Sequence, residues 1–250
     1  MQAFLTLTRR ELAGFFVSLT GYVIIAAVAF QVGLSFVIML NNLNGEGTPM
    51  PITEIFYVTA FFWLILLLSA PVITMRLFAL EKSSGTFETL MTTPVGDLQV
   101  VLAKFFAAIL FYMVMWLPLL GCILIVQHYT GETAGFDAGI AASTYLGIFL
   151  IGCLYMSLGC FASALTRSQI IAAMVSFVIG ITLFLLSFLS EQINLGSAWG
   201  AKALGYIAMR EQMLDFTRGI IDTRYVIFYL SFTLFFLFLT YRVIESRRWK

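Results

Sequence analysis

Six long apolar segments constrain this chain more than any other feature of its sequence. None of them carries an acidic or basic residue in its middle. A helix needs about 20 mostly apolar residues to cross the hydrocarbon core of a bilayer, so segments of this kind predict membrane-spanning helices. The six predicted spans are Thr20–Leu40, Ile55–Met75, Val101–Gln127, Gly139–Leu165, Ile170–Leu189 and Tyr225–Tyr241.

The overall composition excludes a water-soluble globule. Of the 250 residues, 61% are hydrophobic and 11% are charged, whereas a typical soluble domain is about 25% charged. Too few polar side chains remain to cover a surface in water, so the bilayer must act as the solvent. We therefore expect a single all-α integral membrane domain over residues 1–250. The formal net charge of +1 gives no reason to expect a nucleic-acid partner.

The distribution of lysine and arginine predicts the orientation of the spans, because these residues favour cytoplasmic loops. With both termini in the cytoplasm, 10 of the 14 Lys and Arg residues lie on the cytoplasmic side. The short outer connections, Asn41–Glu54 and His128–Ala138, contain neither residue type. We therefore expect a multi-pass membrane protein with both termini in the cytoplasm.

Residues 1–18 have an amphipathic pattern that predicts an interfacial helix along the membrane surface. The alternative is a ragged extension of the first span. At 100° per residue, Gln2, Thr6, Arg10 and Ala13 share the polar face. The expected apolar face consists of Phe4, Leu5, Leu12, Phe15 and Phe16.

Residues 190–224 are too long for a turn and too apolar for a solvated loop. We expect an outer amphipathic or re-entrant element here, immediately before the sixth span. It would contain two short helices, Arg210–Leu214 and Asp215–Gly219. Because Arg218 and Asp222 are four residues apart, a helical ion pair between them is possible.

The spans themselves contain proline, small residues and cysteines. Pro118 lies inside the third span, where it predicts a kink. In the fourth span, small residues recur at four-residue spacing, which favours close helix packing, either within the chain or across a dimer. The small pairs are Cys153 with Ser157 and Gly159 with Ser163; with Cys122, these cysteines are expected to be small core residues.

The sequence lacks the motifs of several kinds of energy-coupled or hydrolytic chemistry. It contains no P-loop and no G-x-S-x-G, and it has a single histidine. The neutral spans argue against proton coupling, which needs ionisable residues inside the bilayer. We therefore expect no metal or cofactor in this chain, no enzymatic activity of its own, and an energy source in another subunit.

The stretch Glu81–Asp97, EKSSGTFETLMTTPVGD, is a dense polar segment between the second and third spans. It belongs to the predicted cytoplasmic loop over residues 76–100. The second helix should continue to Leu80 and break at Ser83-Ser84-Gly85. Thr86 would then cap a short helix, Phe87–Met91, before Pro94 ends it. The apolar residues Phe87, Leu90 and Met91 would be exposed, and an ordinary cytosolic loop is the alternative interpretation.

Four segments, in order along the whole chain, resemble the membrane subunits of type-2 ABC exporters. The subgroup that the sequence resembles most contains the gliding-motility-associated permease and the permease of the copper-enzyme maturation transporter. The most specific segment is Glu81–Phe105, which is similar to the family pattern of Glu, a basic residue, Gly-Thr, Glu, Leu and Pro-Val. The other three are RRELAGFFVSLTGYVI (Arg9–Ile24), LTRSQIIAA (Leu165–Ala173) and DFTRGIIDTRYVIFYLS (Asp215–Ser231).

The resemblance implies that the cytoplasmic loop is a coupling helix that docks on a separate cytosolic ABC ATPase. That ATPase, and not this chain, would bind ATP and Mg. Arg9, Arg10 and Glu11 on the interfacial helix would support the same joint. The docking surface implied by the resemblance consists of Glu81, Lys82, Gly85, Thr86, Glu88, Leu90, Pro94 and Val95.

The resemblance also implies two permease copies, either a homodimer or this chain with a related permease, and a pathway between them. The polar candidates for the pathway lining are Ser69, Thr74, Ser176 and Thr182, although polar groups at these positions are equally typical of helix packing. We therefore expect the permease subunit of an ATP-driven exporter, with a periplasmic protein as a possible further partner. The alternative is a non-transporting membrane scaffold, or a force-transmitting component, that docks the same ATPase.

Overall fold

The computed structural model describes residues 2–43, 54, 56–57, 59–87, 95–130, 138–192 and 206–248. Throughout these residues the regular elements are helices, and six helical segments are long and apolar enough to cross a membrane. The prediction of an all-α integral membrane protein with six spans is therefore confirmed. The six segments are Leu19–Asn41, Ala60–Ser84, Asp97–Val126, Ala138–Leu165, Gln169–Leu189 and Thr223–Ser246.

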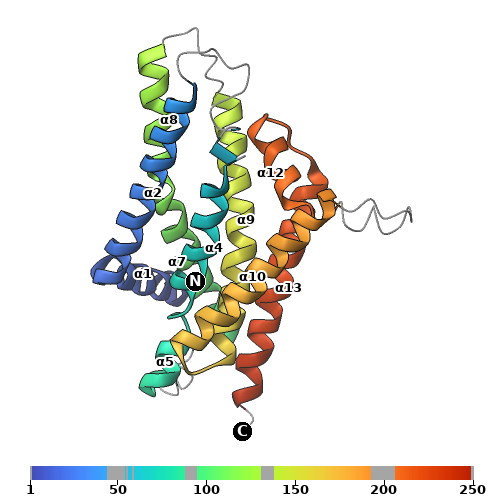
Figure 1. The fold of residues 1–250 in the computed structure, drawn as a ribbon. Coiled ribbons are helices and arrows are strands. Elements are labelled where there is room, and N and C mark those ends of the chain that lie inside the picture. The colour runs from blue at the N-terminus through green and yellow to red at the C-terminus, as the bar shows by residue number, and fades with distance from the viewer. Residues whose placement is uncertain are drawn as a thin grey trace, which may run out of the picture.

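Helix α9 (Ala138–Leu165) is the centre of the bundle, and 83% of its most apolar stretch is buried. Around it pack α4 (Ala60–Thr74), α7 (Asp97–Met115), α10 (Gln169–Gln192) and α13 (Thr223–Arg248) (Figure 1). By contrast, only 22% of the corresponding stretch of α10 and 28% of that of α13 are buried. Apolar side chains on these outer helices are therefore left for lipid or for another chain to cover.

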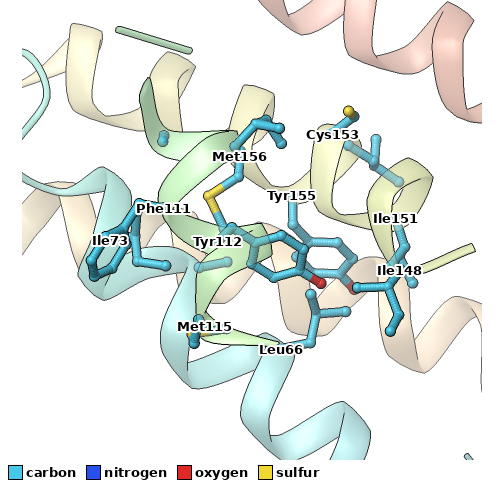
Figure 2. Packing of buried hydrophobic residues seen from close by; sticks show 14 of the residues in the cluster. Leu66, Ile73, Phe111, Tyr112, Met115, Ile148, Ile151, Cys153, Tyr155 and Met156 are labelled. Atoms are coloured by element: carbon cyan, nitrogen blue, oxygen red, sulfur yellow. The ribbon is translucent and has the colours of Figure 1, made fainter. Parts of the chain in front are cut away.

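The buried core contains aromatic rings from several helices. Figure 2 shows Tyr112 of α7 and Tyr155 of α9 among aliphatic side chains such as Leu66 and Ile148. Cys153 and Cys160 are buried in α9 without forming a disulfide, so the prediction that they are small core residues is confirmed. Cys122 is half-buried.

The third span is broken at Trp116, two residues before Pro118. Helix α7 ends at Met115, and α8 (Leu117–Thr130) continues after a single turn residue. The hydroxyl of Tyr145 on α9 donates to the Trp116 carbonyl oxygen at 3.0 Å, which gives a partner to a carbonyl at the break. The kink predicted from Pro118 is confirmed.

Helix α1 (Gln2–Val17) is separate from α2 (Leu19–Leu43) and lies crosswise to the spanning helices (Figure 1). It packs on α7, where the ring of Phe15 stacks on Phe111 at a centroid distance of 4.8 Å. The predicted apolar face is only partly correct, because Leu5 is 62% exposed and Leu7 is buried instead. The alternative, a ragged extension of the first span, is wrong, because α1 and α2 are separate helices. A place for α1 along a membrane surface stays a prediction.

Helix α12 (Met209–Thr217) lies at the end of the bundle opposite α5 (Ala79–Ser84) (Figure 1). We call these the α12 end and the α5 end. The expectation of two short helices is wrong, since one continuous helix packs its buried face on α9. The remaining expected outer element, residues 193–205, lies outside the described residues.

The expected helical pair between Arg218 and Asp222 is also wrong. Gly219 has a φ of +83°, so the helix ends there and the four-residue spacing no longer brings the two side chains together. Asp222 instead accepts a hydrogen bond from the backbone amide of Arg224 at 2.8 Å, at the start of α13. Such a bond satisfies one of the unpaired amides of a helix N-terminus.

The small residues of α9 pack within the chain. A Cβ atom on Gly159 would lie 2.0 Å from the hydroxyl oxygen of Thr74 on α4, so only glycine permits this close crossing. One turn further on, Ser163 contacts the backbone between α4 and α5. The two interpretations left open by the sequence are thereby resolved, for Gly159 and Ser163, in favour of packing inside one subunit.

Candidate functional site

The candidate site lies at the α5 end, where the chain leaves α4 and enters α5. Helix α4 ends at Thr74, and a turn over residues 75–78 precedes α5, so the second helix does not run unbroken to Leu80 as expected. The Ser163 hydroxyl accepts from the amides of Phe78 and Ala79 at 3.0 and 3.1 Å. The first amides of a helix lack partners within it, and here a residue of α9 supplies one.

A buried lysine joins three helices next to this turn. The Nζ atom of Lys104, on α7, lies 2.8 Å from Glu81 of α5 and 3.0 Å from Glu11 of α1. Its side chain is 1% exposed, and Nζ lies 5.5 Å from the centre of the Phe78 ring. Arg10 of α1 completes the group, at 2.7 Å from Glu11 and 3.4 Å from Glu81. We call Arg10, Glu11, Glu81 and Lys104 the charge cluster.

The charge cluster balances two carboxylates against two cations. The carboxylates keep some contact with water, at 15% and 16% exposure, whereas Lys104 is fully desolvated. A buried cation is tolerated only when it is paired and hydrogen-bonded, so Lys104 depends on Glu11 and Glu81. The hydrogen bond with Glu11 also raises the pKa of Arg10, which therefore stays charged. The cluster holds α1, α5 and α7 together by charge.

A second lysine joins α5 to the end of α9. Lys82 donates from Nζ to the carbonyl oxygen of Ala164, and its Nζ lies 5.3 Å from the centre of the Phe87 ring. The last carbonyls of a helix lack intrahelical partners, and a cation there also complements the helix dipole. Phe87 is 8% exposed, so the expectation of an exposed Phe87 is wrong: the aromatic ring covers Lys82 instead.

The described residues of the expected docking surface differ in what their side chains contact and in how exposed they are. Glu81 and Lys82 point inward and hold the helices together, while Gly85 and Thr86 are exposed. Gly85, with a φ of +75°, ends α5. Val95 is half-buried. Glu88, Leu90 and Pro94, together with most of the expected helix Phe87–Met91, lie outside the described residues, and the docking role itself stays a prediction.

The four candidate pathway residues are placed on α4 and α10. The hydroxyls of Ser69, Thr74 and Thr182 bond to carbonyls of their own helices. Ser69, Thr74 and Ser176 are buried, and Thr182 is exposed. Thr74 faces Gly159, so it takes part in helix packing. A pathway role for any of the four stays a prediction.

At the α12 end, an ion pair connects segments that are far apart in the sequence. Arg218 donates from two nitrogen atoms to Glu54 Oε1, at 2.6 and 3.0 Å. Glu54 is 4% exposed, although it stands in the connection before α4. The hydrogen bond with Glu54 raises the pKa of Arg218. The ion pair ties the region before the second span to α12.

Replacing Arg218 with glutamine should loosen the α12 end more than replacing Glu54 with glutamine. The first change leaves a buried carboxylate without its cation, whereas the second leaves an exposed guanidinium that water can solvate. We expect proteolytic cleavage at the α12 end, C-terminal to residue 205, to become several-fold faster in Arg218→Gln. The cleavage rate should change less in Glu54→Gln. Equal acceleration in the two variants would contradict this asymmetry.

The sequence analysis did not identify Lys104 as the partner of Glu11 and Glu81, or Glu54 as the partner of Arg218. Lys104 is one of the ten cytoplasmic Lys and Arg residues used above to predict the orientation. It stands at the start of an apolar span, beside buried Val101 and Ala108. An ionisable residue at such a position indicates a specific partner, and that signal was present in the sequence. No sequence signal connected Glu54 with Arg218, which are 164 residues apart.

Comparison with known proteins agrees with this architecture. Curated proteins gave no significant match to the chain. The model of a family described as ABC-2 family transporter protein matches residues 38–243, which cover all six spans in whole or in part. Because the match covers more than half of the chain, the protein belongs to the ABC-2 transporter family and is a multi-pass membrane permease component of an ABC transporter.

Proposed function

We propose that this permease is the membrane subunit of an ATP-driven exporter, and that a separate cytosolic ABC ATPase docks on the segment around residues 81–95. The observation that carries the proposal is the charge cluster, which joins the base of that segment to α1 and α7. In this arrangement the α5 end faces the cytoplasm. ATP and Mg bind to the ATPase, and the permease has no catalytic residues of its own.

The contacts of α5 suggest how movement reaches the spans. Glu81 connects α5 with α7 and, through Lys104, with α1. Two contacts connect α5 with α9, the central helix: Lys82 bonds to the Ala164 carbonyl oxygen, and the Phe78 amide just before α5 bonds to the Ser163 hydroxyl. A displacement of the docking segment when the two ATPase subunits close would therefore act on three helices together. Contacts of this kind transmit a rigid-body change better than a free loop would.

The finer assignment follows the resemblance of the sequence. We propose the subgroup of gliding-motility-associated and copper-enzyme-maturation permeases, in a bacterial inner membrane with both termini cytoplasmic. Two permease copies, identical or related, would enclose the pathway. The exposed apolar faces of α2, α10 and α13 offer surface for a second copy as well as for lipid. A periplasmic partner protein is compatible with the α12 end.

A charge reversal at Glu88 tests the docking of the ATPase directly. In proteoliposomes that contain the permease and its ATPase, Glu88→Lys should reduce permease-stimulated ATP hydrolysis at least five-fold, because it reverses a charge on the docking surface. Glu211→Lys is the matched control, since it makes the same change at an exposed position of the α12 end. Unchanged hydrolysis in Glu88→Lys, or equal loss in both variants, would show that the docking assignment is wrong.

The scaffold alternative predicts a different result in the same vesicles. A non-transporting scaffold would still stimulate ATP hydrolysis through the docking segment, but nothing would cross the membrane. Transport and hydrolysis measured together therefore separate the two functions. Hydrolysis that continues with no solute movement, across candidate substrates supplied on the ATPase side of the membrane, favours the scaffold.

The proposed orientation predicts which single cysteines react with a membrane-impermeant maleimide. Ser84 is exposed at the α5 end, and Ile220 is 54% exposed at the α12 end. Ser84→Cys should be labelled in inside-out vesicles and protected in intact spheroplasts, while Ile220→Cys should show the reverse. The parent chain is the control, because its three cysteines, Cys122, Cys153 and Cys160, lie within spanning helices and should stay unlabelled on both sides. The opposite labelling pattern would show that the α12 end, and not the α5 end, faces the cytoplasm.

A further inference from the structure

A half-open cleft lies between α1, the start of α2 and the end of α4, and it shares Glu11 with the charge cluster. It encloses about 160 Å³. Pockets that hold a whole drug-sized ligand usually enclose roughly 300–1,000 Å³, so this cleft would enclose only part of a larger molecule. Its lining combines two charged residues, Glu11 and Arg76, with Thr20 and mostly apolar neighbours such as Ile24 and Leu80.

Arg76 is the polar anchor of the cleft. Its Nη1 atom donates to the hydroxyls of Ser18, at 3.0 Å, and Thr20, at 2.5 Å. Within the described part of the chain, no carboxylate lies within ion-pair distance of Arg76. The guanidinium is thus fixed in place by neutral partners while its charge is left uncompensated. A guanidinium held in this way can give two parallel hydrogen bonds to a phosphate.

The remaining charges near the cleft do not cancel that of Arg76. Among the described residues that line the cleft, Glu11 is the only acidic one, and it is already paired with Lys104 at 3.0 Å and Arg10 at 2.7 Å. The charge cluster as a whole is neutral, so among the described residues of the region the positive charge of Arg76 stays unbalanced. An anionic group is therefore the complementary ligand.

The position of the cleft indicates where such an anion would come from. Ser18 and Thr20 flank Leu19, the first residue of the first apolar span, so Arg76 lies at the level where that span begins. Further along the two spans, away from Arg76, the lining of the cleft is apolar and includes Ile24 of α2 and Val72 of α4. The side chain of Val72 is 38% exposed. A ligand with its phosphate at Arg76 would extend its other end along apolar side chains towards the bilayer.

We infer that this cleft binds an anionic phospholipid from the leaflet at the α5 end, with the lipid phosphate on Arg76 and the first part of an acyl chain along α2 and α4. Basic side chains at the ends of spanning helices are a recurrent means of anionic lipid recognition. The partial enclosure fits a molecule whose chains remain in the bilayer. The bound lipid would bridge α1 to α4 next to the charge cluster.

Native mass spectrometry of the delipidated full-length protein tests this inference. Phosphatidylglycerol and phosphatidylcholine are titrated separately, and we expect phosphatidylglycerol to bind at least five-fold more tightly. Arg76→Gln should remove that preference. Arg242→Gln, which removes an exposed arginine near the end of α13, is the matched control and should keep it. Equal binding of both lipids, or an unchanged preference in Arg76→Gln, would overturn the inference.

A second variant tests the cleft without touching Arg76. Gly14 lines the cleft, and a Cβ atom there meets nothing within 4 Å, so a larger side chain can leave α1 at this position without a clash at its first atom. We expect Gly14→Phe to lower phosphatidylglycerol binding at least three-fold while its unfolding temperature stays near that of the parent. Wild-type binding in Gly14→Phe would place the lipid elsewhere. Displacement of the lipid by millimolar inorganic phosphate would assign the cleft to a free anion and would also overturn the inference.

Discussion

Replacing Lys104 with methionine should lower the free energy of unfolding by about 3 kcal/mol, because removal of one partner from a buried ion pair leaves its counter-charges uncompensated. Methionine keeps the length and the apolar stem of lysine, so the packing of α7 changes little. Glu11 and Glu81 would then face each other with only the exposed Arg10 between them. Partial exposure of both carboxylates keeps the loss at the lower end of the range for buried pairs. The measurement is thermal unfolding of the purified protein in one detergent.

The triple variant Glu11→Gln, Glu81→Gln, Lys104→Met separates charge from packing. With the carboxylates neutralised, no buried charge is left unpaired, and we expect more than half of the lost stability to return. Arg242→Met is the control for loss of a surface ion pair, which contributes at most about 1 kcal/mol. A triple variant as unstable as Lys104→Met alone would mean that Lys104 acts through packing and not through charge.

The second large effect is expected at the crossing of α4 and α9. In Gly159→Ala, the new Cβ atom would lie 2.0 Å from Thr74 Oγ1 and 2.5 Å from Thr74 Cβ. Atoms cannot approach so closely, so the two helices must move apart or Thr74 must give up its bond to the Ala70 carbonyl. Overpacking of a tight core costs about 1–3 kcal/mol, and at the central helix we expect the upper end of that range. A fall in the unfolding temperature of the purified protein measures it.

Gly33→Ala is the matched control for Gly159→Ala. Gly33 is also in the middle of a spanning helix, but a Cβ atom there meets nothing within 4 Å. Alanine is the better helix former, so this variant should be neutral or slightly more stable. The double variant Thr74→Gly, Gly159→Ala should recover part of the loss by moving the small residue to the other helix. Similar behaviour of Gly159→Ala and Gly33→Ala would contradict the close crossing.

The parts of the fold that could be predicted from the sequence are those with a local or one-dimensional signal. The spans follow from length and apolarity, since a bilayer accepts only segments whose backbone bonds are satisfied internally. The break before Pro118 follows from the missing amide and the ring of proline. The small residues of α9 indicated close packing, but the spacing alone did not identify Thr74 as the neighbour of Gly159.

Two predictions about individual side chains were wrong: one assumed a continuous helix, and the other assumed that an apolar side chain in a polar segment is exposed. Arg218 and Asp222 were paired on the assumption of an unbroken helix, and the turn at Gly219 separates them. Phe87 was expected to be exposed on the short helix Phe87–Met91, yet its ring covers Lys82. Arg218 pairs instead with Glu54 from another part of the chain, and Lys82, which Phe87 covers, is held by the end of α9.

The sequence by itself determined that this chain lies in a membrane, how many times it can cross, and which polar segment interrupts the apolar spans. These properties depend on composition along short stretches, and the bilayer imposes the same demand on each stretch. Only the tertiary structure decided that Glu81 is part of the charge cluster, that Ser163 satisfies the start of α5, and that Arg76 lines a cleft. Such contacts join residues far apart in the chain, and their distances follow from how the helices pack together.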